Sequence, residues 1–185
     1  IRLNGQISEN ALKSAYVVKI SNNFDWDISN KPIKIGVLSN NKDFYTTLEN
    51  YSQQKNIGGR PIKIDLLQTS KSLGDYDVIY VGEEKNKALT FCKKEIKGSR
   101  TLLFTNFAAS LENSMINFYL SHDQKIKFKI NTRFLKEHQF EPSNLMLVLG
   151  GSENDILSLF EKKDSSIVLE RKSALKLKAQ NTKQK

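Results

Sequence analysis

Two alternating apolar–polar segments, joined by a short polar turn, constrain the fold of this chain more than any other feature. They span residues 115–120 and 125–131, and strict alternation with a period of two is typical of half-buried antiparallel strands. Opposed residues of such a pair share one face of the sheet. We therefore expect Phe118 opposite Phe128, flanked by the pairs Leu120–Ile126 and Ile116–Ile130. Because these pairs share one face, the loop between the strands must have an odd number of residues, most simply residues 122–124.

The other face of this hairpin is polar and basic and resembles no catalytic set. It carries Asn117, Tyr119, Lys125, Lys127, Lys129 and Asn131. An oligonucleotide platform needs aromatic rings among its lysines, and this face offers only Tyr119. We expect a solvated strand face that opposes aggregation. Asn117 and Asn131 either contact a partner or serve the structure, by bonding the hairpin ends and capping a helix.

The order of the elements along the chain predicts an α/β fold. Helical periodicity covers residues 8–22, 43–54 and 83–97, and short helices are expected up to residue 138 and over 143–149. Strands are expected over residues 33–38, 61–67, 77–81 and 100–105. The predicted architecture is a mixed sheet flanked by helices on both faces, with a C-terminal β-hairpin and a projecting terminal helix.

Gly150 and Gly151 mark the expected domain boundary. Residues 1–150 form the predicted α/β domain, and residues 151–185 form a basic helical tail or signalling helix. The net charge is +9, and residues 161–185 hold eight Lys or Arg and three Asp or Glu. More than half of the excess charge therefore lies in the tail. This leaves open a cytosolic nucleic-acid-binding protein, whose affinity would depend on the tail and fall steeply with salt.

The chain offers little catalytic chemistry. It has two histidines and one cysteine, and neither His122, in the hairpin turn, nor His138 has a helical partner for a metal. Cys92 is expected to be a core residue. We predict no catalytic residues, no metal and no cofactor; a hydrolase or transferase is the weakest hypothesis because no nucleophile–base pair is apparent.

Two further positions are candidates for contact with a ligand or partner. Arg60 follows a Gly-Gly turn and either pairs with a surface carboxylate or lies beside an anion. Phe24 and Trp26 stand in a loop, where they either plug the core or wall a small apolar pocket. Residues 1–5 lack the apolar segment of a signal peptide, so we expect a cytosolic protein or one whose leader has been removed.

Five short motifs in order resemble the YfiR-like family of bacterial periplasmic proteins. They are the first helix leading to Phe24-Asp25-Trp26, then residues 35–38, 59–62, 115–118 and 127–131. The last two correspond to the M-I-N-F and F-x-I-N strands of the family. Three departures stand out: Asp27 replaces a proline, residues 112–114 replace a glycine-rich segment, and the disulfide cysteines of the best-known members are missing, so their redox control is not carried over.

The resemblance implies a non-catalytic sensor or regulatory domain on the periplasmic or extracellular side of a bacterial membrane. Such a domain controls a membrane-bound signalling protein, either a diguanylate cyclase or its own downstream receptor modules, such as a histidine kinase. A small-molecule ligand and a homodimer are expected, and nucleic acid is not. The expected contact residues are Phe24, Trp26, Arg60, Asn117 and Asn131.

Overall fold

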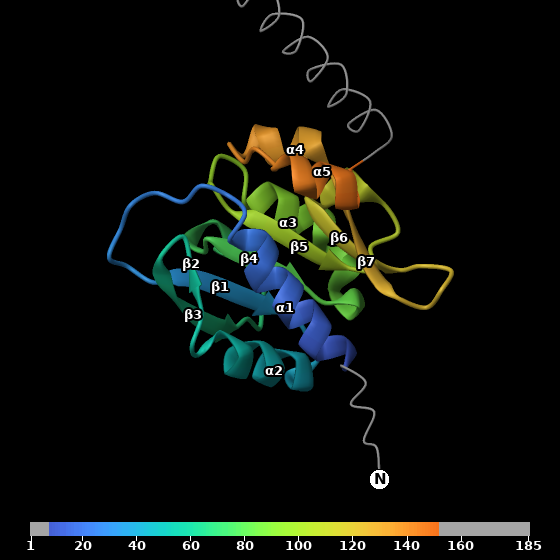
Figure 1. Ribbon diagram of the computed structural model, residues 1–185, viewed down its shortest axis with the longest axis horizontal. Helices are drawn as coiled ribbons and strands as arrows, with labels where there is room; N and C mark the ends of the chain where they lie inside the picture. Colours follow the sequence, from blue (N-terminus) through green and yellow to red (C-terminus); the bar gives the residue numbers. More distant parts are fainter. Residues whose placement is uncertain (1–7, 152–185) are drawn as a thin grey trace, which may run out of the picture.

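A seven-stranded mixed sheet runs through the protein in the order β2-β3-β1-β4-β5-β6-β7 (Figure 1). The computed structural model describes residues 8–151. Strands β3, β1, β4, β5 and β6 are mutually parallel, whereas β2 and β7 pair antiparallel at the two edges. The strands are β1 Ile33–Leu38, β2 Asn56–Ile57, β3 Arg60–Leu66, β4 Val78–Val81, β5 Leu102–Asn106, β6 Ile116–Leu120 and β7 Ile126–Ile130.

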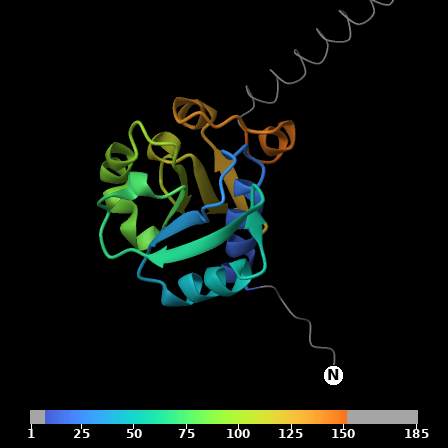
Figure 2. The same ribbon diagram turned by 90° about the vertical axis from the view of Figure 1, so that its left-hand side faces the viewer.

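Helices cover both faces of the sheet, as Figures 1 and 2 show. The helices α1 and α2 lie side by side on one face, and α3 lies on the other. The helices are α1 Glu9–Ser21, α2 Lys42–Ser52, α3 Leu89–Glu95, α4 Thr132–Glu137 and α5 Asn144–Gly150, with 3-10 turns η1 Leu73–Asp75, η2 Glu83–Ala88 and η3 Leu111–Asn113. The predicted mixed sheet with helices on both faces is confirmed. The predicted terminal helix, and with it the division at residue 150, involves residues outside those described.

The hairpin of β6 and β7 has the predicted register. Phe118 pairs with Phe128, Leu120 with Ile126 and Ile116 with Ile130. The Ser121 amide then donates to the Lys125 carbonyl at 2.9 Å, so the connection has three residues, as parity required. The expectation of a solvated polar face holds for Lys127 and Lys129 of β7, which are exposed, but it is wrong for Asn117 of β6. Asn117 is buried, since the segment after β5 folds over it.

The predicted helix over residues 83–97 is two elements rather than one. Residues 83–88 form the 3-10 turn η2, and α3 begins only at Leu89. The side-chain amide of Asn86 donates to the carbonyls of Asn106 and Phe107, at 3.1 and 3.2 Å. This tether holds η2 at the end of β5. The helix stop was predicted correctly: Gly98 has φ of 81°, a conformation that favours glycine.

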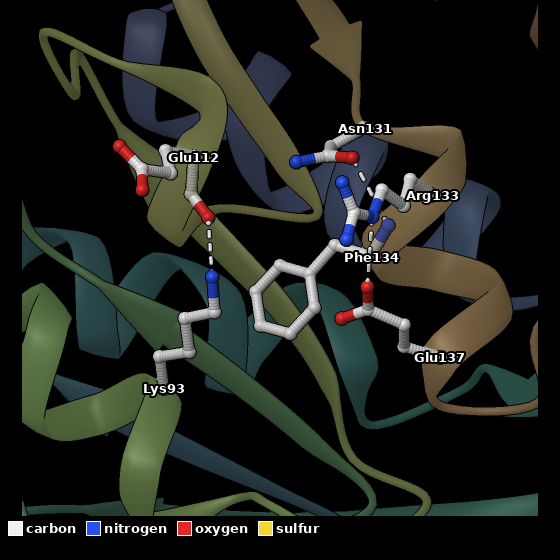
Figure 3. A pocket seen from close by; sticks show the side chains of 6 residues that line it. All are labelled: Lys93, Glu112, Asn131, Arg133, Phe134 and Glu137. Carbon is white, nitrogen blue, oxygen red and sulfur yellow. Dashed lines mark hydrogen bonds and ion pairs between the residues drawn. The ribbon is translucent and has the colours of Figure 1, made fainter.

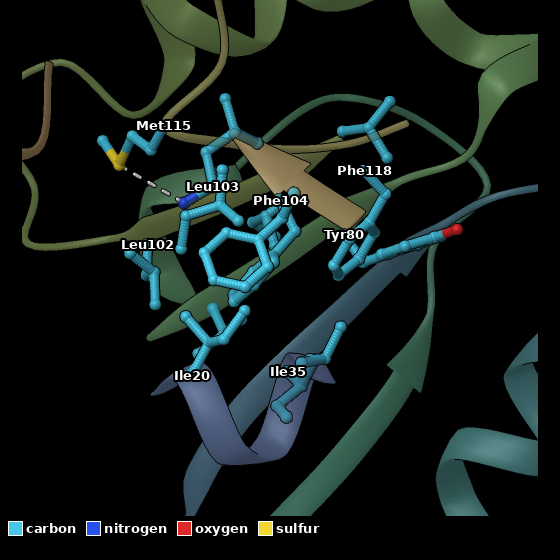
Figure 4. Packing of buried hydrophobic residues seen from close by; sticks show 14 of the residues in the cluster. Ile20, Ile35, Tyr80, Leu102, Leu103, Phe104, Met115 and Phe118 are labelled. Carbon is cyan, nitrogen blue, oxygen red and sulfur yellow. Dashed lines mark hydrogen bonds between the residues drawn. The ribbon is translucent and has the colours of Figure 1, made fainter. Parts of the chain in front are cut away.

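The core lies on both sides of the central strands, and β4 is buried along its whole length, as its apolar sequence predicted. On the α1 side, Ile20 packs above the sheet close to Phe104 (Figure 4). On the opposite side Met115 lies near β5, and its sulfur accepts a bond from the Leu103 amide at 3.4 Å. Within residues 8–151, none of the helices is long and apolar enough to cross a membrane.

Candidate functional site

Trp26 anchors the start of the loop that joins α1 to β1. Its indole nitrogen donates to the Ser21 carbonyl at 2.7 Å. The ring lies against Gly58, where an added Cβ would stand 3.0 Å from Trp26 side-chain atoms, and Gly58 has φ of 56°. The Gly58 amide donates to Asn22 Oδ1 at 2.9 Å. The predicted Gly-Gly turn therefore exists, and it places glycine where the tryptophan needs space.

Phe140 completes an aromatic cluster around this anchor. Its ring packs edge-on against Phe24 and Trp26, with centroid distances of 5.2 and 5.5 Å. Arg100 lies over Phe140 at 5.2 Å and over Trp26 at 5.9 Å. It also pairs with Asp27 at 3.3 Å. Because Phe24 is buried, the geometry favours a core plug over a pocket wall.

Arg60 anchors the other end of the same loop. Its Nε donates to the Lys31 carbonyl at 2.7 Å, and its Nη2 donates to the Pro32 carbonyl at 3.3 Å. The Asp77 carboxylate lies 3.8 Å away and itself accepts the Lys34 amide at 2.8 Å. Arg60 therefore pairs with a carboxylate, as one of the two expected alternatives had it, but it is buried and also binds backbone carbonyls.

Ile28 lies between these two anchors and is fully exposed. Large apolar side chains usually gain from burial, at about 25 cal/mol per Å² of apolar surface. We name residues 24–32 the anchored loop, because Trp26 and Arg60 hold it to the body while Ile28 points to solvent. Sequence reasoning missed Ile28. The available signal was a single large apolar residue among the polar residues 27–31.

Asn117 lies elsewhere, inside the body on the α3 side of the sheet. Its Oδ1 accepts the Ala108 amide at 3.0 Å, and its Nδ2 donates to the Ala108 carbonyl at 2.9 Å. The Thr105 hydroxyl donates to the same Oδ1 at 2.9 Å, and Ser114 Oγ lies 2.7 Å from that hydroxyl. These hydrogen bonds hold the segment around Ala108, which follows β5, against the sheet. The structural alternative is therefore favoured for Asn117.

Asn131 caps α4. Its Oδ1 accepts the Phe134 amide at 3.0 Å, and its Nδ2 donates to the Leu111 carbonyl at 2.8 Å. A side-chain oxygen at this position satisfies an amide that has no partner within the helix. The structure thus brings Phe24, Trp26 and Arg60 to the anchored loop, but it places Asn117 and Asn131 apart from that loop.

The groups with reactive potential are not assembled into a site. Cys92 is buried as predicted, and burial raises the pKa of its thiol to about 11, opposite to the change that activates a nucleophile. Among residues 8–151, no cluster of three or more His, Cys, Asp or Glu could hold a metal ion. The candidate site among the described residues is therefore the anchored loop.

Residues 10–150 match the family model described as YfiR/HmsC-like. The match spans most of the chain, so the protein belongs to the YfiR/HmsC-like family, as its motifs predicted. This family consists of non-catalytic periplasmic regulators that act on a membrane signalling protein, a diguanylate cyclase. A comparison with curated proteins found no match.

We predict that Asn117→Ala lowers the free energy of unfolding by about 2–6 kcal/mol, because each of the two buried Ala108 backbone groups left without a partner costs about 1–3 kcal/mol. Urea denaturation followed by circular dichroism measures this change. Asn41→Asp is the control: Asn41 Oδ1 caps α2 by accepting the Phe44 amide at 2.9 Å, and aspartate retains this capping oxygen, so the change should cost about 0.5 kcal/mol or less. Equal stabilities for Asn117→Ala and the unsubstituted protein would show that the network is not structural.

Proposed function

We propose that this protein is an extracytoplasmic sensor or regulatory domain that controls a membrane-bound diguanylate cyclase by direct contact through the anchored loop. The exposure of Ile28 between the partly buried Trp26 and the buried Arg60 is the observation that carries the proposal. Membership of a family of periplasmic regulators supports the kind of partner. A receptor with histidine kinase modules is the second expected partner.

The anchored loop suits protein contact because it is held in place before binding. Association costs free energy when loops must become ordered, and a loop already fixed avoids part of that cost. Burying Ile28 in a partner would contribute about 1.5–3 kcal/mol. Asp27, beside Ile28, forms an ion pair with Arg100, but because its carboxylate is exposed this pair adds little to the ordering of the loop.

For the regulatory mechanism, we propose that the α/β body has two conformations. Binding would shift the equilibrium between them by about 1–3 kcal/mol. The last described helix, α5, is firmly seated on β7. An added Cβ at Gly150 would stand 2.5 Å from Phe128 Cε2, so only glycine allows this approach. A change in the body on binding would therefore be passed to the position of α5. Gating by a small ligand would act on the same equilibrium.

We expect Ile28→Asp to abolish control of the cyclase while leaving the fold unchanged. The side chain is fully exposed, so the free energy of unfolding should change by no more than about 0.5 kcal/mol. An aspartate buried at the interface would lack a partner and weaken binding. The measurement is cellular cyclic-di-GMP in a native host that lacks the gene and is complemented with each variant.

Leu120→Asp is the matched control, because Leu120 is an exposed apolar residue in the hairpin, on the opposite side of the body from the anchored loop (Figure 1). It should restore the cyclic-di-GMP level as the unsubstituted chain does. Full restoration by Ile28→Asp would exclude the anchored loop as the contact. An unchanged cyclic-di-GMP level on deletion of the gene would contradict control of a cyclase altogether.

We extend the proposal to a homodimer formed through α5. Leu145, Val148 and Leu149 are each about 60% exposed and share one side of this helix by their spacing. No residue of α5 is charged. A second copy is the occupant we propose, because a charge-free face can pair with itself about a twofold axis without burying a charge.

Sedimentation of the purified full chain tests this dimer. We predict that Leu145→Glu combined with Leu149→Glu yields monomers, whereas Leu120→Glu leaves the dimer intact. The paired glutamates would bring like charges together at the twofold interface. A monomeric unsubstituted chain, or a dimer that survives both glutamates, would refute pairing through α5.

A further inference from the structure

A basic groove lies between α3 and α4, apart from the anchored loop. It consists of two adjoining hollows of about 400 and 240 Å³, and both are lined by Lys93, Phe134 and Glu137. Figure 3 shows the smaller hollow, where the Phe134 ring lies beside the Lys93 side chain. Because three elements, α3, η3 and α4, supply the walls, the groove is a feature of the folded body and not of one helix.

Cations dominate the rim of the groove. Lys94 and Lys97 line the larger hollow, and within residues 8–151 neither forms an ion pair. Of the two carboxylates that line the groove, Glu137 is already paired with Arg133 at 3.1 Å. The groove therefore has an excess of positive charge that the described residues do not neutralise.

The floor of the groove is aromatic and fixed in place. Phe134 packs edge-on against His138, with centroids 5.1 Å apart. The His138 Nδ1 lies 2.7 Å from the Ser99 carbonyl, so this nitrogen carries the proton and donates, and the ring orientation is set. Lys93 donates to the Glu112 carbonyl at 2.9 Å and lies 4.9 Å from the Phe134 centroid (Figure 3).

We propose that this groove binds a small aromatic anion. The ring would lie over the Phe134–His138 floor and against the aliphatic stems of the lysines, which are apolar along most of their length. The negative group would bind Lys94 and Lys97, where charge-assisted hydrogen bonds are available. The volume suits a small organic molecule. This proposal does not depend on the anchored loop or on the identity of the signalling partner.

Titration of the isotope-labelled full chain with phenyl phosphate, followed by amide NMR, tests the proposal. Phenyl phosphate combines an anion with a ring; inorganic phosphate and benzyl alcohol each supply one of the two. We expect saturable shifts at residues 90–97 and 131–138 with phenyl phosphate, at lower concentrations than with either control compound. Equal affinity for phenyl phosphate and inorganic phosphate would overturn the aromatic part of the site.

The substitution pair Lys94→Gln and Lys97→Gln should weaken phenyl phosphate binding at least about tenfold, since hydrogen bonds to charged groups are the stronger class. Lys19→Gln with Lys42→Gln removes the same charge from exposed residues of α1 and α2, on the opposite face of the sheet, and should leave the affinity within about twofold, given the screening of distant surface charges. An equal loss in both pairs would mean general attraction to a basic protein, and shifts confined to other residues would place the ligand elsewhere. Either result overturns the proposal.

Discussion

Phe44, Tyr80, Phe118 and Tyr16 form a continuous run of ring contacts between the sheet and the helices α1 and α2. Phe44 stacks on Tyr80 at 4.0 Å, Tyr80 contacts Phe118 at 6.5 Å, and Tyr16 stacks on Phe118 at 6.0 Å. These contacts join the two helices to the strands β4 and β6, and such rings contribute large buried areas. With α1 fixed in this way, its last residues lie where Trp26 can bond the Ser21 carbonyl. The anchored loop therefore depends on this aromatic packing.

The anchored loop connects the core packing to the surface that we propose for regulation. The side chains of its two anchors, the partly buried Trp26 and the buried Arg60, bind backbone carbonyls. The exposed side chain of Ile28 packs against no other residue in the described range 8–151. In the proposed mechanism, Trp26 and Arg60 would therefore affect regulation without contacting the partner themselves. Their substitution would release the loop and raise the ordering cost of binding. Ile28 would make the contact, and Trp26 and Arg60 would position it.

The hairpin register could be predicted from sequence because alternation and loop parity leave one pairing of Phe118 with Phe128. Alternation also placed Asn117 on the opposite face, but it could not show that Ala108 would cover that face. The partners of Arg60 are backbone carbonyls of residues 31 and 32, and backbone atoms leave no signal in a sequence. The sequence also does not show that the lysines of α3 lie beside Phe134 and His138, because those two residues come from a distant segment.

Regulation, as proposed, works through contact between the anchored loop and a membrane signalling protein. Photocrosslinking in the native host measures this contact directly, with benzoylphenylalanine replacing Ile28 and, in a control strain, Leu120. We predict that position 28 crosslinks to a protein that mass spectrometry identifies as a diguanylate cyclase or a histidine kinase receptor, and that position 120 does not. A crosslink to such a protein from position 120 alone, or none from position 28, would contradict the account.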